Sequence, residues 1–287
     1  MEAPKITIVG SINMDLMTSV PRIPEQGETL LANSFIVKPG GKGANQAVAA
    51  ARLGADVTMI GKVGSDSFGI ELREQLEKEG IDIQHVEVEH ATSTGIANII
   101  LYENDNRIMV VPGANEYVTP KYVEQNKSQL LHSDLVLMQL EIPIETIVWC
   151  ANFCFENNIP IIINPAPALD LPEEIWRKCK YITPNEEEAI KLFGTNIDDY
   201  EDSLITTLGS RGARYKDNIV PSFPTNVVDT TGVGDTFNGA LATYIASGLD
   251  INDAILKANI AASLAIEKAG AQEGMPTWEQ VEGRCTE

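Results

Sequence analysis

The chain contains 287 residues, 44% of them hydrophobic and 22% charged, so it is long enough to bury the core of one large domain with or without a small accessory piece. Its 21 lysines and arginines against 41 aspartates and glutamates give a formal net charge of −20, which argues against a nucleic-acid-binding protein because such proteins present a basic face. The sequence shows no basic, apolar leader and no run of about 18 apolar residues, and we therefore expect a cytoplasmic protein that spans no membrane.

In chain order, short apolar runs typical of buried parallel strands alternate with patterns typical of helices. Strands are predicted at residues 6–9, 57–60, 135–140, 159–163, 181–183 and 204–207. Helices are predicted at residues 43–53, 69–78, 120–131, 144–157, 186–193, 235–247 and 252–268. This order favours an α/β fold with a doubly wound, mainly parallel sheet flanked by helices, in which ligands bind beyond the carboxyl ends of the strands.

Two segments interrupt the alternation. Residues 29–38 are extended and partly polar, and residues 94–101 and 107–111 resemble two strands joined by a hairpin turn. Together they predict a small inserted β-sheet that forms a lid and excludes water from a cleft, although an ordinary edge hairpin would give the same periodicity. The expected division is an α/β core of residues 1–11, 39–91 and 115–287, with a discontinuous lid of residues 12–38 and 92–114.

The most informative segment reads Asp229-Thr230-Thr231-Gly232-Val233-Gly234-Asp235 and leads into a predicted helix. Backbone N–H groups at a glycine-rich helix start attract anions, because they lack intrahelical partners and the helix dipole adds positive potential. A carboxylate there would repel a bound phosphate unless it had a chemical role. The natural role is to accept a proton from a hydroxyl that attacks the phosphoryl group, which predicts a small-molecule kinase. The alternative is a flexible helix start without function.

Two further segments offer groups that suit a sugar. In the loop of residues 40–45, the glycines permit close approach of the backbone to a ligand, and Lys42 and Asn45 add donors. Asn13 and Asp15 are two apart in an extended segment, so they point to the same side and could bind paired hydroxyls, although Asx-turn chemistry is equally compatible. The Walker A spacing is absent from the sequence, which excludes a P-loop mechanism.

The cysteines and histidines indicate no metal or nucleophile chemistry. Cys150 and Cys154 lie four apart on a predicted helix, but neither a second close pair nor a nearby histidine completes a zinc-binding set. We expect them to be buried core thiols. The three histidines are scattered in polar stretches, which disfavours a Ser–His–Asp or Cys–His system.

Ordered motifs along nearly the whole chain resemble the PfkB carbohydrate kinase family. The two signature segments are residues 40–47 and 229–237, and further matches occur at residues 10–15, 113–115, 138–141, 164–168, 183–186 and 207–212. The resemblance implies ATP-dependent phosphorylation of D-ribose at the 5-hydroxyl, giving ribose 5-phosphate and ADP. Related kinases acting on deoxyribose, fructose or a nucleoside are alternatives, although the aliphatic lid argues against a nucleoside. A non-catalytic sugar-binding protein on this fold is a further alternative, which Asp235 disfavours.

The resemblance also assigns roles to matching positions. The general base is Asp235, and the anion hole consists of the amides of Gly232, Val233 and Gly234. The sugar-binding residues are Asn13, Asp15, Gly41, Lys42, Asn45, Glu141 and Asp235. The nucleotide-binding residues are Asn185, Glu188, Thr207, Gly209, Gly212 and Asn259. The monovalent cation, usually K⁺, is expected at Asp229, Thr231, Ala265, Lys268, Gly270 and Gly274, several of them through backbone carbonyls.

Mg²⁺ and a homodimer are also expected, the homodimer from the same resemblance. Asn185 and Glu188 would arrange Mg²⁺ and its waters near the phosphates, although Asn185 is equally suited to cap the helix that follows it. Exposed edges of the lid would pair two copies. One region departs from the family pattern, because residues 195–203 are too few for a further strand and helix, a difference of about twenty residues. Either residues are omitted there, or a deletion exposes a sheet edge near the nucleotide site.

Overall fold

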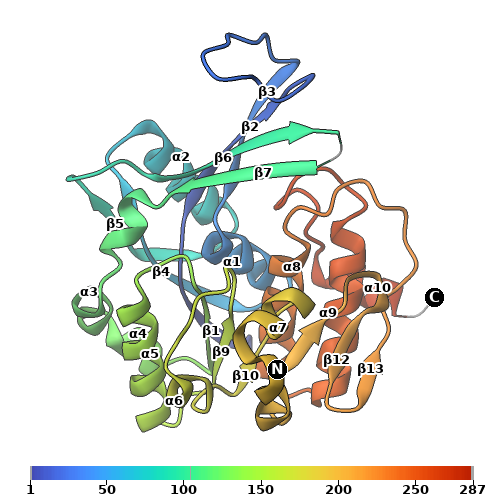
Figure 1. The fold of residues 1–287 in the computed structure, drawn as a ribbon. Helices are drawn as coiled ribbons and strands as arrows, with labels where there is room; N and C mark the ends of the chain where they lie inside the picture. The colour runs from blue at the N-terminus through green and yellow to red at the C-terminus, as the bar shows by residue number, and fades with distance from the viewer. Residues whose placement is uncertain (1, 104, 286–287) are drawn as a thin grey trace.

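The central element of the fold is a six-stranded, all-parallel sheet (Figure 1). The computed structural model describes residues 2–103 and 105–285. The strand order is β10 (Tyr181–Ile182), β9 (Ile161–Asn164), β8 (Leu135–Gln139), β1 (Lys5–Val9), β4 (Asp56–Gly64) and β5 (Asp82–Glu89). The chain adds strands on one side of β1 and then on the other, so the topological switch point lies between β1 and β8. Ligands bind at such a point in open α/β sheets.

Helices cover both faces of this sheet. One face is covered by α1 (Lys42–Arg52), α2 (Ser67–Lys78), α8 (Val233–Ala246), α9 (Ile251–Ala265) and α10 (Trp278–Arg284). The other is covered by α3 (Pro120–Gln125), α4 (Lys127–Leu131), α5 (Ile144–Glu156), α6 (Glu173–Trp176) and α7 (Glu186–Phe193). Successive residues of β8 enter opposite cores, Leu135 and Leu137 the first and Val136 and Met138 the second. Burial on both faces explains the continuous apolar runs, and the predicted doubly wound fold is confirmed.

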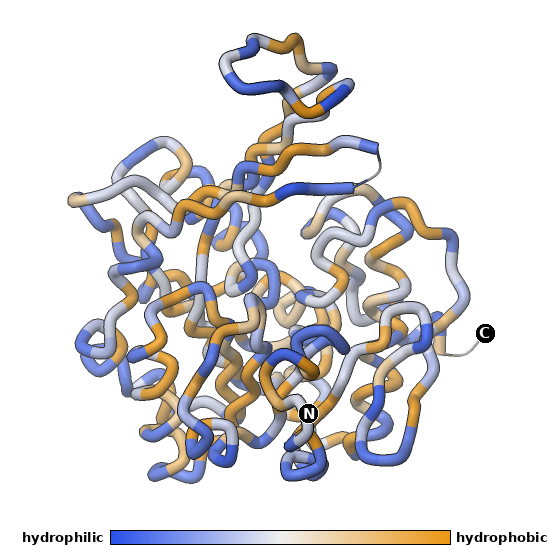
Figure 2. The backbone as a smooth tube through the Cα atoms, in the orientation of Figure 1, coloured by the Kyte–Doolittle hydropathy of each residue, from blue (hydrophilic) through white to orange (hydrophobic). Residues whose placement is uncertain are grey.

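A mixed four-stranded sheet projects from the core (Figure 1). This lid sheet has the order β3 (Ser34–Gly40), β2 (Asn13–Ser19), β6 (Gly95–Tyr102) and β7 (Asp105–Val111). The predicted inserted sheet is confirmed, and its second strand, β2, comes from a segment that the sequence indicated only as extended. Figure 2 shows hydrophobic residues along these strands as well as within the core. All the residues of β7 are exposed, Ile108 and Met109 among them.

The short connection after α7 forms one complete crossover. The 3₁₀ segment η2 (Gly194–Tyr200) leads to β11 (Ile205–Thr207), and parallel bridges join Ile182 to Leu204 and Asn185 to Thr207. On its other side β11 pairs antiparallel with β12 (Ala213–Tyr215), which pairs with β13 (Asn218–Val220). This strand therefore has neighbours on both sides, and it does not show the exposed edge that was one of the two alternatives for this region.

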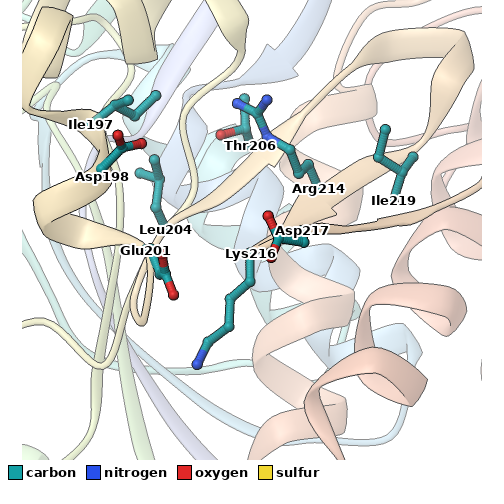
Figure 3. A pocket seen from close by; sticks show the side chains of 9 residues that line it. All are labelled: Ile197, Asp198, Glu201, Leu204, Thr206, Arg214, Lys216, Asp217 and Ile219. Carbon is teal, nitrogen blue, oxygen red and sulfur yellow. The ribbon is translucent and has the colours of Figure 1, made fainter.

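A cavity of about 310 Å³ accompanies this short crossover (Figure 3). It lies between η2 and the strands β11–β13, and Ile219 in its wall is 49% exposed. Its lining residues are Ile197, Asp198, Glu201, Leu204, Thr206, Arg214, Lys216, Asp217 and Ile219. None of the predicted site residues is among them.

Two smaller differences from the sequence prediction concern the ends of helices. The single helix expected at 120–131 divides into α3 and α4 at Asn126, where the backbone N donates to the Val123 carbonyl oxygen and the side-chain Nδ2 donates to the Tyr122 carbonyl oxygen. The last long helix ends at Ala265, three residues earlier than expected. Cys150 and Cys154 are buried as predicted. In the part of the chain that the structure describes, no helix has the length and apolarity required to cross a bilayer.

Candidate active site

The glycine-rich turn at 232–234 begins α8, and Gly234 in this turn is exposed. Gly232 is the N-cap, with a left-handed φ of 73°, and a Cβ there would approach the Ala271 Cβ at 2.8 Å. A side chain at Gly234 would instead meet nothing within 4 Å. The first turn of a helix leaves N–H groups without intrahelical partners, so a ligand has room at a place that favours anions. Val233 N is already engaged, because it donates to the Thr230 carbonyl oxygen at 3.3 Å.

Asp235 lies in this first turn and is held by two amides of α1. Its Oδ1 accepts from Gln46 Nε2 at 3.0 Å, and its Oδ2 accepts from Asn45 Nδ2 at 2.9 Å. Asp235 is only 7% exposed. Burial raises the pKa of Asp235, and the opposing influence of Lys42 and the two amides does not cancel that rise. The carboxylate is therefore a better proton acceptor than a solvated aspartate.

Lys42 places a positive charge among the carboxylates of the site. Burial alone would lower the pKa of Lys42, but Asp235, Glu141, Glu188 and Asp15 outweigh burial and the pKa rises. The ammonium group therefore stays protonated at neutral pH.

The backbone of the loop at residues 40–45 is fixed by hydrogen bonds with Ser11 and Glu141. Ser11 follows β1, and Glu141 follows β8. Ser11 Oγ donates to Glu141 Oε2 at 2.5 Å and accepts from Gly43 N at 3.3 Å. Glu141 Oε2 also accepts from Lys42 N at 3.2 Å. A Cβ on Gly43 would approach Ser11 N at 2.6 Å, so only glycine permits this contact.

Asp15 projects from β2 against the loop that precedes α1. A Cβ on Gly40 would approach its carboxylate oxygens at 2.3 Å, and one on Gly41 would approach Asn13 N at 2.6 Å. Burial, and then the charges of Glu141 and Asp235, raise the pKa of Asp15 to about 7, against a smaller opposing effect of Lys42. Asp15 thus changes its charge close to neutral pH.

All seven predicted sugar-binding residues line one cavity of about 230 Å³. The lid sheet adds Ala97, Ile99, Asn106, Ile108 and Val110 to its wall, and the loop before α8 adds Thr230, Thr231 and Gly232. The cavity therefore joins polar groups of the core, Asp235 among them, to aliphatic residues of the lid. Sequence reasoning missed Ser11, Gln46 and Gln272 as supporting residues. Ser11 and Gln46 carried a signal, because each lies within a matching motif, at residues 10–15 and 40–47, whereas Gln272 carried none.

On the predicted nucleotide side, the amides are engaged by the protein itself. Asn185 and Glu188 form a reciprocal capping box on α7, with Glu188 N donating to Asn185 Oδ1 and Asn185 N to Glu188 Oε2, both at 2.8 Å. Asn259 Nδ2 donates to the carbonyl oxygens of Val220 and Pro221 at 2.9 and 3.2 Å. The capping interpretation of Asn185 is therefore correct, and Asn259 anchors the segment after β13.

Thr207, Gly209 and Gly212 lie together around the end of β11. Gly209 and Gly212 have positive φ angles of 58° and 98°, and a Cβ on Gly212 would approach the Val220 carbonyl oxygen at 2.1 Å. The turn therefore requires glycine at these positions. Glycine there lets the backbone of the turn lie close to the end of the sheet.

Of the predicted cation residues, Thr231 and Gly270 bond to Asp229. Its Oδ1 accepts from Thr231 N at 2.9 Å and from Thr231 Oγ1 at 2.7 Å, and its Oδ2 accepts from Gly270 N at 2.9 Å. Burial would raise the pKa of Asp229, but these hydrogen bonds outweigh burial and lower it. A Cβ on Gly274 would approach the Ala265 carbonyl oxygen at 2.1 Å. Carboxylate and backbone carbonyl oxygens are ligands that suit a hard cation, and the predicted residues offer the Asp229 carboxylate and the Ala265 carbonyl oxygen. The structure gives Lys268 no comparable contact in this group.

A buried carboxylate at a glycine-rich helix start, facing a cavity lined by hydroxyl-binding groups beneath a lid, defines a kinase of small polyhydroxylated molecules. The profile of the pfkB family of carbohydrate kinases matches residues 3–278, and the chain belongs to this family. It is similar to a ribokinase of Bacillus subtilis (strain 168), at 46% identity over 286 residues, covering 96% of this chain and 98% of that protein.

Two further comparisons agree. A ribokinase of Lactococcus lactis is 44% identical over 293 residues, with 99% of this chain and 97% of that protein covered. The solved structure of Arabidopsis thaliana ribokinase, complexed with ribose and ATP, superposes with a TM-score of 0.90 at 29% identity and covers 98% of both chains.

Proposed function

We propose that this chain transfers the γ-phosphoryl group of ATP to the 5-hydroxyl of D-ribose and releases ribose 5-phosphate and ADP. The observation that carries the proposal is the position of Asp235, in the wall of the sugar-sized cavity and in the first turn of α8. The similarity to ribokinases at 46% and 44% identity supports ribose as the substrate. The aliphatic lid residues of the cavity give no aromatic surface for a nucleoside base.

The proposed reaction uses this chain's residues in three roles. Asp235 accepts the proton of the 5-hydroxyl as its oxygen attacks the γ-phosphorus, which general base catalysis requires. The amides of Gly232, Val233 and Gly234 hold the phosphoryl oxygens, and Val233 N leaves the Thr230 carbonyl oxygen to do so. Lys42 adds a fixed positive charge. Asn13, Asp15, Gly41, Asn45 and Glu141 orient the sugar, so that positioning supplies much of the rate.

Two metal ions complete the proposal. Asn185 and Glu188, with Thr207, Gly209, Gly212 and Asn259 on the nucleotide side, would hold ATP and its Mg²⁺, which neutralises phosphate charge during transfer. Asp229, Thr231, Ala265, Lys268, Gly270 and Gly274 would surround K⁺. Because Asp229 bonds Thr231 next to Gly232, ordering this loop orders the amides that begin α8.

The lid is proposed to close over the sugar and to form a dimer interface. We assign residues 12–38 and 92–114 to the lid, and the remainder to the core. Phe35 on β3 and Ile108, Met109 and Val111 on β7 are 50–61% exposed, and apolar residues on an exposed edge strand favour pairing with a second copy. We expect the enzyme to act in the cytoplasm, as a homodimer.

The test is a coupled ADP-release assay of the purified chain with ribose, 2-deoxyribose, fructose and adenosine, each with and without K⁺. We expect the highest kcat/KM with ribose and stimulation by K⁺. Turnover of adenosine without turnover of ribose would reject the proposed substrate. ADP release that no sugar stimulates would reject the proposed reaction.

A further inference from the structure

We propose that Asn115 is a positioning residue for the sugar, and that it acts by fixing the orientation of the Asn13 side-chain amide. Asn115 lies in the 3₁₀ segment η1 (Gly113–Tyr117), directly after the lid sheet. It is only 1% exposed and does not line the cavity. This inference rests on the proposed function, because it concerns how that sugar is held.

One backbone N–H determines the orientation of both amides. Ile12 N donates to Asn115 Oδ1 at 2.9 Å, and a backbone N–H can only donate, so the amide nitrogen of Asn115 must lie on the opposite side. That nitrogen donates to the Asn13 Oδ1 at 2.7 Å and to the Pro112 carbonyl oxygen at 2.9 Å. With its oxygen occupied by Asn115, Asn13 has its Nδ2 to offer to the cavity that it lines.

Close packing prevents these amides from rearranging. A Cβ on Gly95 would lie 2.3 Å from both Asn115 Nδ2 and Asn13 Oδ1, so only a hydrogen atom fits beside this pair. Gly95 begins β6 and pairs with Asn13 at the start of β2. The hydrogen bond between the amides therefore lies where β2 and β6 leave the core. Asn115 itself lies where the chain re-enters the core after β7.

This arrangement links the base of the lid sheet to the chemistry of the sugar cavity. A rotated Asn13 amide would present an acceptor where the cavity now has a donor. A sugar hydroxyl oriented for the donor would lose that bond and leave a buried polar group unpaired. Asn115 thus controls the affinity for the sugar, whereas it has no contact with Asp235.

The experiment compares Asn115→Asp and Asn115→Ser with the wild-type chain. Aspartate still accepts from Ile12 N but cannot donate to Asn13, and serine is too short to reach Asn13 and adds no buried charge. We expect the KM for ribose to rise about tenfold or more in both variants, while kcat changes less than about threefold because the base and its amides are untouched. Direct ribose binding by calorimetry should weaken in parallel.

A double-mutant cycle with Asn13→Ala separates positioning from a general structural effect. If Asn115 acts through Asn13, then Asn115→Asp raises KM less than about twofold in the Asn13→Ala background. Asn126→Asp serves as the matched control, since Asn126 also bonds a backbone carbonyl oxygen and a side chain but lies between α3 and α4; its KM should stay at the wild-type value.

Three results would overturn the inference. These are an unchanged KM in folded Asn115 variants, an equal effect of Asn115→Asp with and without Asn13, and failure of both variants to fold, which would make the residue a structural one. If the wild-type chain binds and phosphorylates ribose, these results leave the proposed function intact. A wild-type chain that does not phosphorylate ribose rejects the proposed function itself.

Discussion

Asn45 donates from its Nδ2 to Asp235 Oδ2 at 2.9 Å, across 190 residues of sequence. The same side chain accepts at its Oδ1 from Gln272 Nε2 at 3.0 Å. Gln272 lies in the segment after α9 that also contains Gly270 and Gly274, two of the residues expected at the cation. The orientation of the Asn45 amide, and with it one of the two hydrogen bonds on the proposed base, is therefore set by the same segment that would hold the cation.

Asp235→Asn removes the proton acceptor and preserves the shape of the side chain. We expect kcat for ribose to fall by a factor of at least about 10² to 10⁴, the range for loss of a general base, while ribose still binds. Steady-state kinetics and calorimetric titration with ribose measure the two quantities. Asp253→Asn, an exposed carboxylate on α9, is the control and should keep wild-type kcat. A kcat within about threefold of wild type in Asp235→Asn would exclude this base.

Gln272→Glu tests the control of Asp235 by the segment after α9. A carboxylate cannot donate to Asn45 Oδ1, so the Asn45 amide turns and its oxygen, instead of its nitrogen, faces Asp235. Loss of that donor, together with a new negative charge nearby, raises the pKa of Asp235 further. Because the base must be ionised, the acid limb of the kcat/KM profile should move to higher pH. Gln125→Glu on α3 is the control, and an acid limb that stays in place in Gln272→Glu would refute the link.

Asp229→Ala tests the cation residues. The carboxylate organises Thr231 and Gly270 through three hydrogen bonds, so its loss frees the loop before α8 as well as removing a charged ligand. We expect the stimulation of ADP release by K⁺ to disappear and kcat to fall at saturating ATP. The thermal midpoint, measured in KCl and in a choline salt, should lose its dependence on K⁺. A K⁺ response equal to that of the wild type would remove Asp229 from the site.

Asp15→Asn tests the charge balance of the sugar cavity. A carboxyl whose pKa rises to about 7 on folding, from about 3.9 in the unfolded chain, binds a proton that the unfolded chain has released. The free energy of unfolding therefore decreases as pH rises between about 4 and 7. Asp15→Asn should remove this decrease, so the variant gains stability relative to wild type from pH 5 to pH 8. Urea unfolding at both pH values measures the difference, with exposed Glu71→Gln as control.

The sign of this change is decisive for Asp15. A variant that instead loses stability relative to wild type as pH rises would show that the Asp15 carboxylate is stabilised in the folded chain, as an ion-paired group would be. Equal differences at the two pH values would show that its ionisation is not coupled to folding.

Local patterns were sufficient for most of the architecture. A strand buried on both faces favours apolar residues at successive positions, as the first four residues of Leu135–Gln139 show, and a glycine-rich turn before a run of small residues marks a helix start, as at Gly232. The same approach failed at Asn13–Ser19, because this strand is only half buried and its residues alternate weakly. It also left the crossover after α7 unresolved, since strand neighbours are decided by pairing across the sheet and not by sequence.

The sequence by itself determined the alternation of strands and helices, the position of the carboxylate at the start of α8, and the residues that converge on one cavity through the family motifs. Only the tertiary structure decided what holds those residues in place: Gln46 and Asn45 on Asp235, Gln272 on Asn45, Ser11 on Glu141, and Asn115 on Asn13. Periodicity and capping arise from neighbours along the chain, which a sequence displays directly. Hydrogen bonds between side chains more than a hundred residues apart arise from packing, and no local pattern encodes which end of a buried amide faces its partner.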